Sequence, residues 1–328
     1  MNKKERVDAA LRDEPVDRVP VSMWGHDFER EWGAQSLMEA MVENFTRYDW
    51  DFMKVNPRAC YHVEGWGARY RPSGQKFQEP IFESTPIKNA SDWKRLRPLE
   101  PDRGSFGEQL RALQLINHAV GFEAYFVQTI FCPLGVAQYL VGGTEPVLNT
   151  IQEDRTAMHR ALSVIAETLT SYAIACLEYG ASGIFYATNG WASQGMLTQD
   201  QYHEFGEQYD LEILDAIKSR SKFNVLHICG KGIYFDLLSS YPAHAISWAA
   251  TLEGNPDLRE GKLSSSKAVM GGISEKTTLL TGSPGQVQDE VGKALELTGG
   301  RRLLLAPGCA IAPETPAKNV EAIRRMLS

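Results

Sequence analysis

The sequence contains no run of 18 apolar residues, and its first six residues, Met1 to Arg6, are mostly charged. Neither a membrane-spanning helix nor a secretory signal segment is therefore expected. Cysteine is scarce and odd in number, with five residues scattered at positions 60, 132, 176, 229 and 309. Such a set fits no disulfide framework and is typical of thiols in a reducing compartment. We expect a cytoplasmic protein with no membrane partner.

Basic residues are fewer than acidic ones, with 34 Lys and Arg against 41 Asp and Glu, which gives a formal net charge of −7. A nucleic-acid partner is not expected, because neutralising phosphates requires clustered Lys and Arg. No Gly-x-Gly-x-x-Gly turn follows a predicted strand and no Gly-x-x-x-x-Gly-Lys-Ser/Thr loop occurs, which disfavours a doubly wound nucleotide-binding fold. Internal repeats and linker-like changes in composition are missing as well, so residues 1–328 are expected to form a single domain.

Short β-rich stretches alternate with helical stretches, a pattern typical of parallel strands joined by helical crossovers. Eight stretches are predicted as strands: Val19–Trp24, Asp51–Val55, Phe126–Phe131, Gly183–Ala187, Asn224–Cys229, Ala245–Ala249, Ala268–Ile273 and Arg302–Ala306. Eight strands favour an α/β fold of the single (β/α)8 or TIM-barrel type. Cap signals at Thr198 with Gln201, and at Ser283 before Pro284, predict two helix starts. Residues 65–100 have no clear period and are predicted to form a long insertion after the second strand.

A His-x-Cys pair ends one of these strands. His227 and Cys229 are two residues apart, so they point to the same side of the strand at its carboxyl end. Cys309 follows the last predicted strand after a Pro-Gly turn, and in a barrel both strand exits open on the same face. One His and two Cys can hold zinc with the fourth position left open for substrate. A buried histidine and two buried thiols with only packing roles are the alternative.

Several further segments resemble one known family. They are Asp17-Arg18-Val19-Pro20-Val21, the His227-x-Cys229-Gly230 strand end, Glu253-Gly254-Asn255-Pro256, Ala268-Val269-Met270-Gly271-Gly272-Ile273 and Ala306-Pro307-Gly308-Cys309. Over essentially the whole chain, the sequence resembles the uroporphyrinogen decarboxylase superfamily and, more narrowly, its zinc-dependent, corrinoid-linked methyltransferase branch. The resemblance implies a (β/α)8 barrel and a zinc site at His227, Cys229 and Cys309.

The resemblance also implies an activity, the transfer of a methyl group between a corrinoid (cobalamin) and a small thiol or methoxylated substrate bound at zinc. In one direction a substrate thiolate takes the methyl group from methyl-cobalt(III). In the other, cobalt(I) takes it from an ether, thioether or amine. The Asp-x-His-x-x-Gly signature of corrinoid-binding domains is absent, because His118-x-x-Gly121 and His227-x-x-Gly230 lack the Asp. A separate corrinoid protein is therefore expected as partner, and a homodimer is left open.

Two other functions remain as alternatives. Porphyrinogen decarboxylases hold a substrate with many carboxylates through an arginine-rich segment after the first strand. The matching segment here offers only Arg30 beside the acidic Asp27, Glu29 and Glu31, which suits a polyanion poorly. A metal-independent decarboxylase is thus the second hypothesis, and a non-catalytic barrel that keeps the fold is the third.

Polar and aromatic side chains after the strands predict the substrate pocket. The expected substrate-binding residues are Tyr61, His62, Trp66, Asn189 and Trp191. We expect catalytic roles for Glu64 and for His26, which follows the first strand, because carboxylates and imidazoles are common general acids and bases. Packing of a long loop onto the barrel is the alternative for the aromatic residues, and surface exposure is the alternative for His26. Cys60, Cys132 and Cys176 are expected to be bystanders.

Overall fold

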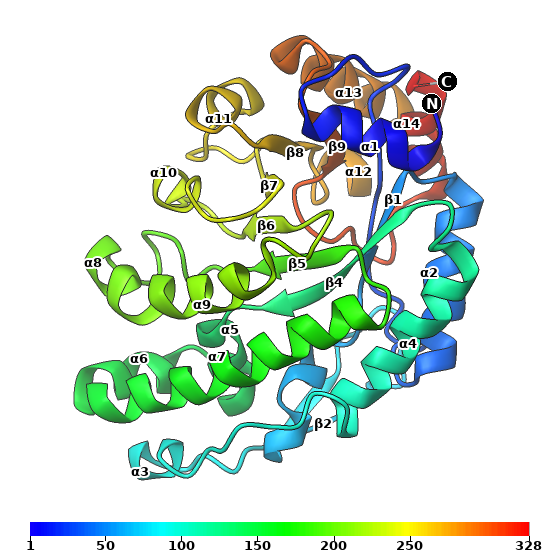
Figure 1. Cartoon of the computed structure of the whole chain (residues 1–328). Helices are drawn as coiled ribbons and strands as arrows, with labels where there is room; N and C mark the ends of the chain where they lie inside the picture. Colours follow the sequence, from blue (N-terminus) through cyan, green and yellow to red (C-terminus); the bar gives the residue numbers. More distant parts are fainter. Residues whose placement is uncertain (328) are drawn as a thin grey trace.

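Seven parallel strands form a curled sheet in the computed structural model, which describes residues 1–327 (Figure 1). Neighbouring strands run in the order β1-β4-β5-β6-β7-β8-β9. Their bounds are β1 (Phe52–Val55), β4 (Tyr125–Phe131), β5 (Gly183–Ala187), β6 (Val225–Ile228), β7 (Ala245–Trp248), β8 (Ala268–Ile273) and β9 (Leu303–Pro307). Because every pair is parallel, the carboxyl ends of all seven strands lie on one rim. The strands predicted from the sequence agree with these seven to within one residue at each end.

The eighth predicted strand, Val19–Trp24, is not a regular strand. It makes only one isolated parallel bridge, between Val21 and Leu305 of β9, and the next residue after it, Gly25, makes another with Ile311. On its other side the Asp51 amide donates a 2.9 Å hydrogen bond to the Val21 carbonyl, so the segment lies between β9 and β1. Pro20 has no N–H to donate, which prevents a continuous ladder here. The segment therefore bridges the gap in the curled sheet without forming a strand.

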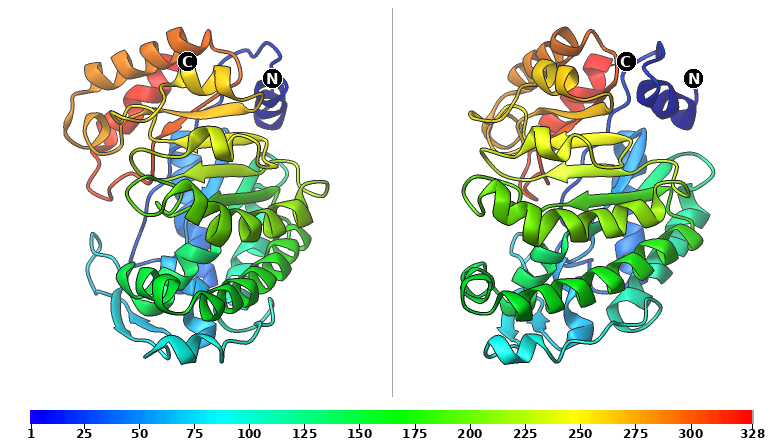
Figure 2. Two further views of the ribbon diagram at one scale, coloured as in Figure 1. Left: turned by 90° about the vertical axis from the view of Figure 1, so that its left-hand side faces the viewer. Right: turned by 60° about the vertical axis from the view of Figure 1, so that its left-hand side comes forward.

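Helices cover the outer face of the sheet, and the two chain ends lie on the same side of the molecule (Figure 2). The longer helices are α1 (Lys3–Leu11), α2 (Ala34–Tyr48), α4 (Gly104–Val120), α5 (Pro133–Val141), α6 (Glu145–Glu153), α7 (Arg155–Glu178), α9 (Gln208–Ile217), α11 (Leu258–Ser264), α13 (Pro284–Thr298) and α14 (Ala317–Leu327). The short ones are α3 (Ala90–Trp93), α8 (Gln199–Tyr202), α10 (Phe235–Leu238), α12 (Thr278–Thr281) and the π-helical turn η3 (His203–Glu207). The two predicted cap signals are confirmed, with capping boxes at Thr198 and Ser283.

The segment between β1 and α4 contains more regular structure than its sequence indicates. It holds two 3-10 turns, η1 (Ala59–His62) and η2 (Glu64–Trp66), and an antiparallel hairpin of β2 (Arg69–Arg71) and β3 (Ile81–Ser84). The hairpin strands are short and largely exposed, so they lack the apolar run that marks a buried strand. Trp93 fixes the end of the segment, since its indole is buried and donates to Thr150 Oγ1 at 3.2 Å.

Helix α7 is long and apolar enough to cross a membrane by length and composition, the one such helix among the described residues. Within the structure, 56% of its most apolar stretch is buried. Its buried side chains include Leu162, Ile165, Leu169 and Tyr172, and it packs against α5, α6 and α9. We therefore interpret α7 as a core helix.

The inside of the barrel is layered. Phe52, Val127, Val225 and Ala245 belong to an apolar cluster and lie on β1, β4, β6 and β7. Two residues further along their strands, side chains point to the same side, because successive residues of a strand alternate between its faces. This next level carries polar groups, namely Lys54, Thr129, His227 and Ser247, all of them buried. On these four strands, an apolar level thus lies below polar side chains nearer the carboxyl rim.

Behind β5, a fully buried carboxylate accepts three tyrosine hydroxyls. Asp210 of α9 receives hydrogen bonds from Tyr186 at 2.6 Å, from Tyr202 at 2.5 Å and from Tyr241 at 3.4 Å. These hydroxyls favour the charged carboxylate, but burial outweighs them and raises the pKa of Asp210 to about 7. The ordinary pKa of an unfolded Asp is about 3.9. Between pH 4 and 7 the folded protein therefore binds the proton that the unfolded chain has lost.

The pH dependence of stability follows from this shift. Asp210 contributes most below about pH 4, and its contribution falls as the pH rises toward 7, by up to about 1.4 kcal/mol per pH unit. We expect the stability of wild type relative to Asp210→Asn to decline over this range, as measured by urea unfolding at pH 5, 6 and 7. The exposed Asp215→Asn is the matched control and should give no such slope. A constant difference between wild type and Asp210→Asn would contradict the assignment.

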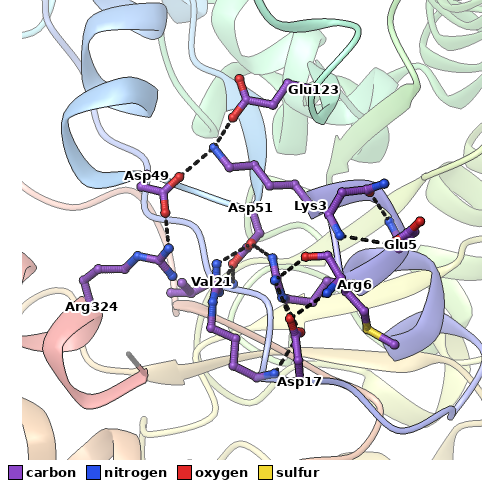
Figure 3. Close-up of polar contacts among 12 residues, drawn as sticks. Lys3, Glu5, Arg6, Asp17, Val21, Asp49, Asp51, Glu123 and Arg324 are labelled. Atoms are coloured by element: carbon purple, nitrogen blue, oxygen red, sulfur yellow. Dashed lines mark hydrogen bonds and ion pairs between the residues drawn. The ribbon is translucent and has the colours of Figure 1, made fainter.

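At the opposite end of the barrel from the rim, a network of ion pairs joins the N-terminal segment to β1 (Figure 3). Asp51 is fully buried and accepts hydrogen bonds from Arg6 Nη1 at 2.7 Å, from both Nη atoms of Arg18 and from the Val21 amide. Arg6 also pairs with Asp17 at 2.7 Å. Helix α1 is thereby fixed across the base of the barrel. The network holds the irregular segment 19–25 beside β1.

Candidate metal centre

His227, Cys229 and Cys309 form a tight group at the carboxyl rim, hereafter the His-Cys-Cys cluster. Their candidate ligand atoms all lie within 4.8 Å of one another. His227 is on β6, Cys229 follows that strand directly, and Cys309 comes two residues after β9. His227 is buried, whereas both cysteines are partly exposed. The cluster is therefore anchored in the barrel and open on the side of the two sulfurs.

A glycine brings the third member to the cluster. A Cβ built on Gly308 would lie 2.8 Å from Ala249 Cα and 2.8 Å from a carboxylate oxygen of Glu275. Both distances are shorter than side-chain carbons tolerate, so a larger residue would push the turn away from β7. The Pro307-Gly308 turn thus sets the approach of Cys309 to the other two ligands.

The imidazole of His227 is held from one side only. Its Nδ1 lies 3.1 Å from Ser247 Oγ, and its ring stacks on Phe185 at a centroid distance of 5.1 Å. Its Nε2 is buried and has no hydrogen-bond partner in residues 1–327. A buried imidazole nitrogen without a partner is uncommon, and beside two thiols it suits a metal ligand.

The two cysteines of the cluster differ in acidity. The neighbouring Cys229 thiol and His227 hold the pKa of Cys309 well below its usual value. The contact between the two thiols and burial raise the pKa of Cys229 well above its usual value. These opposite shifts favour ionisation of Cys309 over ionisation of Cys229. Thiolates are the form in which cysteine binds metals.

Glu275 and Lys54 are two charged residues near the cluster that the sequence analysis missed. Glu275 follows β8 and is buried, and burial raises its pKa. Its position two residues after the predicted strand Ala268–Ile273 was the signal that could have revealed it. Lys54 is buried inside the barrel on β1. A lysine within an otherwise apolar strand was the corresponding signal, since lysine is rarely buried without a partner.

Among the predicted substrate-binding residues, Asn189 is connected to the cluster through its neighbour in the chain. It follows Thr188, whose hydroxyl accepts a hydrogen bond from the Cys229 amide at 3.4 Å. Its backbone is left-handed, with a φ of 50°. Its side-chain Oδ1 is buried and has no hydrogen-bond partner in residues 1–327. A strained residue with an unsatisfied acceptor is a common feature of functional sites.

The other predicted substrate-binding residues are occupied by contacts within the fold. Both ring nitrogens of His62 have partners, the Ala59 carbonyl and the Phe131 amide, and burial lowers its pKa to about 3. Tyr61 donates to Thr129 O at 2.6 Å. The two indoles, Trp66 and Trp191, donate to Arg97 O and Gln138 Oε1. These contacts explain how the loops pack, and a role in substrate binding stays a prediction.

The two residues predicted to be catalytic lie in separate ion pairs. Both carboxylate oxygens of Glu64 bind Arg58, at 2.7 and 2.9 Å. His26 Nδ1 lies 2.8 Å from Glu31 Oε1, and its ring stacks on Phe28. His26 also lines a cavity of about 310 Å³ between α2 and residues 311–320, which none of the three cluster residues lines. The structure therefore gives neither residue a contact with the cluster, and their catalytic roles remain predictions.

Fold and site together define a class, an α/β barrel-like protein with histidine and thiol groups gathered at the carboxyl ends of its strands. A family model described as uroporphyrinogen decarboxylase (URO-D) matches residues 2–327. The chain belongs to this family. The resemblance noted in the sequence is thereby confirmed.

The chain is similar in sequence to relatives of two kinds. "Methylcobamide:CoM methyltransferase MtaA" of Methanosarcina barkeri is 27% identical over 344 residues, covering 98% of this chain and 96% of that protein. The protein named "Methylcobamide:CoM methyltransferase MtbA" of Methanosarcina acetivorans is 23% identical over 333 residues, covering 97% and 95%. "Uroporphyrinogen decarboxylase" of Prochlorococcus marinus (strain NATL1A) is 25% identical over 302 residues, covering 89% and 82%.

Among solved structures, a methyltransferase from Methanosarcina mazei superposes with a TM-score of 0.84 at 25% identity, covering 99% of this chain and 98% of that one. A B12-independent methionine synthase from Shewanella has a TM-score of 0.59 at 13% identity, with 95% and 92% covered. The second likeness concerns the fold alone. Both support a barrel-like α/β architecture over nearly the whole chain.

Proposed function

We propose that this chain is a methyltransferase subunit that moves a methyl group between a corrinoid and a small thiol or methoxylated substrate at a zinc-binding His-Cys-Cys cluster. The observation that carries the proposal is the convergence of the three ligand atoms to within 4.8 Å at the carboxyl rim. The relatives named for methylcobamide and CoM support the same activity. In this proposal residues 1–328 form a single domain that carries the whole activity of the subunit.

The donor set fits zinc. One imidazole and two thiolates are a common combination of three protein ligands, and a catalytic zinc site keeps its fourth position for substrate. The buried, unpartnered Nε2 of His227 and the sulfur of Cys309, whose pKa lies well below its usual value, suit the deprotonated ligands that binding requires. When bound there, zinc would supply Lewis acidity that keeps a substrate sulfur as the nucleophilic thiolate or stabilises a leaving heteroatom.

The chain's own residues orient the cluster. Ser247 on β7 fixes the His227 ring through Nδ1, which leaves Nε2 directed away from that contact. The partly exposed sulfurs leave room on their side for a substrate and for a corrinoid presented by a partner protein, as methyl transfer needs donor and acceptor in line and nearly touching. The five free thiols favour a reducing compartment, consistent with action in the cytoplasm.

Ser247→Ala tests this orienting contact. Removing a partner that orients a metal-bound histidine usually lowers metal affinity about 10- to 100-fold. We expect Ser247→Ala to bind zinc more weakly by this factor, measured by competition with a chelator. The exposed Ser240→Ala is a control that should keep wild-type affinity. Equal affinity in Ser247→Ala and wild type would mean that Ser247 does not orient the ligand.

The direct test of the activity mixes the protein with free methylcobalamin and a panel of small thiols. The spectral change that occurs when cobalt loses its methyl group measures the reaction. The reverse direction uses cobalt(I) cobalamin with methoxylated aromatics. We expect methyl transfer in one direction and no transfer by protein stripped of metal. Silence in both assays, with carbon dioxide released from a porphyrinogen, would favour the decarboxylase instead. One contact disfavours the decarboxylase: Arg30 donates a 2.7 Å hydrogen bond to Glu43, so its guanidinium is already paired with a carboxylate of this chain.

A further inference from the structure

Asn255 belongs to the segment 253–256, one of the stretches that resemble the known family, and the metal cluster by itself gives this residue no role. It lies in the loop between β7 and α11. Its Nδ2 donates hydrogen bonds to the Gly230 carbonyl at 2.9 Å and to the Ala249 carbonyl at 3.2 Å. Its Oδ1 accepts one from the Gly232 amide at 2.9 Å. Both ends of the side-chain amide are therefore bound to backbone groups.

These backbone groups flank two of the three candidate ligands. Gly230 follows Cys229 directly, so one bond from Asn255 holds the loop that carries this cysteine. Ala249 supports the turn that leads to the third ligand, because a Cβ built on Gly308 would lie 2.8 Å from Ala249 Cα. A single side chain thus joins the loop of one cysteine to the residue against which the turn of the other cysteine packs.

The loop that carries Cys229 is attached on two sides. Its Gly230 and Gly232 have φ values of 108° and 63°, which glycine adopts without strain, so the loop residues permit this shape without fixing it. Toward β5, the Gln194 amide donates to the Gly232 carbonyl at 3.0 Å. Toward β7, the loop is held by Asn255. The attachment toward β7 leads on to the residue that supports the third ligand.

We propose that Asn255 is a positioning residue, which sets the distance between the sulfurs of Cys229 and Cys309 by joining the two loops. Metal ligands bind tightly when supporting contacts already hold them at the separation that the metal requires. A loop that must be ordered on binding weakens the affinity. The inference rests on the proposed function where zinc is concerned, and it adds a residue that touches none of the ligand side chains.

Two substitutions separate the roles of the two ends of the amide. Asn255→Asp is nearly isosteric and still accepts the Gly232 hydrogen bond, but its carboxylate cannot donate to the carbonyls of Gly230 and Ala249. Asn255→Ala removes all three bonds. We expect both variants to bind zinc roughly 10- to 100-fold more weakly than wild type, as found for contacts that support metal ligands. Competition with a chelator measures the affinity.

Asn319→Ala is the matched control. Asn319 on α14 is fully buried, and its Nδ2 also donates to two backbone carbonyls, those of Leu279 at 3.0 Å and Gly282 at 2.8 Å. The control therefore removes the same kind of contact from a part of the fold outside the cluster. It should keep the zinc affinity of wild type.

A second readout needs no metal. Phenylarsine oxide reacts with two neighbouring thiols at once, forming two As–S bonds and releasing one water, so its affinity depends on the spacing of the sulfurs. Reduced, metal-free wild type and Asn319→Ala should bind it equally well, and both Asn255 variants should bind it more weakly. Cys309→Ala, which leaves one thiol in the cluster, sets the background. Circular dichroism checks that every variant is folded.

The outcomes separate the positioning role from the activity. If wild type binds no zinc, the proposed function fails, while the arsenical titration still decides whether Asn255 sets the spacing. Wild-type affinity of Asn255→Asp for the arsenical overturns the inference. Equal weakening in Asn319→Ala also overturns it, because any loosening of the fold would then have the same effect. Loss of the folded state in both Asn255 variants overturns it as well, since the residue would then serve the barrel as a whole.

Discussion

Cys309→Ala is expected to lower the zinc content of the purified protein from about one ion per chain to nearly none, and to slow methyl transfer from methylcobalamin to a thiol by more than about 100-fold. The physical reason is that only His227 and Cys229 remain, and two protein ligands do not retain zinc against dilution. Elemental analysis and the spectral assay measure the two effects. Cys309→Ala should lower zinc affinity more than Ser247→Ala does, because Cys309 is proposed to bind the metal directly.

The control for Cys309→Ala is Cys176→Ala, which removes a buried thiol from α7, outside the cluster. It should keep zinc and activity. Both variants should keep the circular dichroism spectrum of wild type, because a barrel of this size has a core that does not depend on one metal. Stoichiometric zinc in Cys309→Ala would refute the ligand assignment.

Asp51→Asn is expected to lower the free energy of unfolding by about 3–5 kcal/mol, the usual cost of removing one partner from a buried ion pair. Asp51 faces Arg6 and Arg18 at the base of the barrel, and an amide cannot balance the two guanidinium charges (Figure 3). The segment 19–25 is tied to this carboxylate as well, because the Val21 amide donates a 2.9 Å hydrogen bond to Asp51 Oδ2. Urea unfolding measures the change.

The comparison for Asp51→Asn is Asp215→Asn at an exposed pair with Lys218, where surface ion pairs contribute about 0–1 kcal/mol. The base of the barrel is far along the strands from the rim, so zinc content should survive in folded Asp51→Asn protein. A change in stability no larger than that of the surface control would show that the network in Figure 3 does not hold the N-terminal segment.

The sequence was informative wherever one local rule decides the outcome. Buried parallel strands read as apolar runs, so seven of them were predicted to within a residue. The two-residue spacing of His227 and Cys229 placed both at one strand end, and the resemblance to a family paired them with Cys309. The structure brings these three together, although the metal itself remains a proposal.

What the sequence could not provide depends on partners distant in the chain. His62 and Glu64 look chemically available, yet the Phe131 amide and Arg58 occupy them. Lys54 reads as an interruption in a strand, and only the fold places its ammonium beside Phe185 and near Cys309. The segment Val19–Trp24 has the apolar pattern of a strand, but Pro20 and its neighbours on both sides reduce it to isolated bridges.

X-ray absorption at the zinc edge of the purified, metal-loaded protein tests the central claim most directly. The account predicts one nitrogen neighbour at about 2.0 Å and two sulfur neighbours at about 2.3 Å, with a lighter or exchangeable fourth ligand that a third sulfur replaces when a thiol substrate is added. Zinc surrounded only by oxygen and nitrogen, or a sulfur shell that persists in the Cys229→Ala, Cys309→Ala double variant, would contradict it.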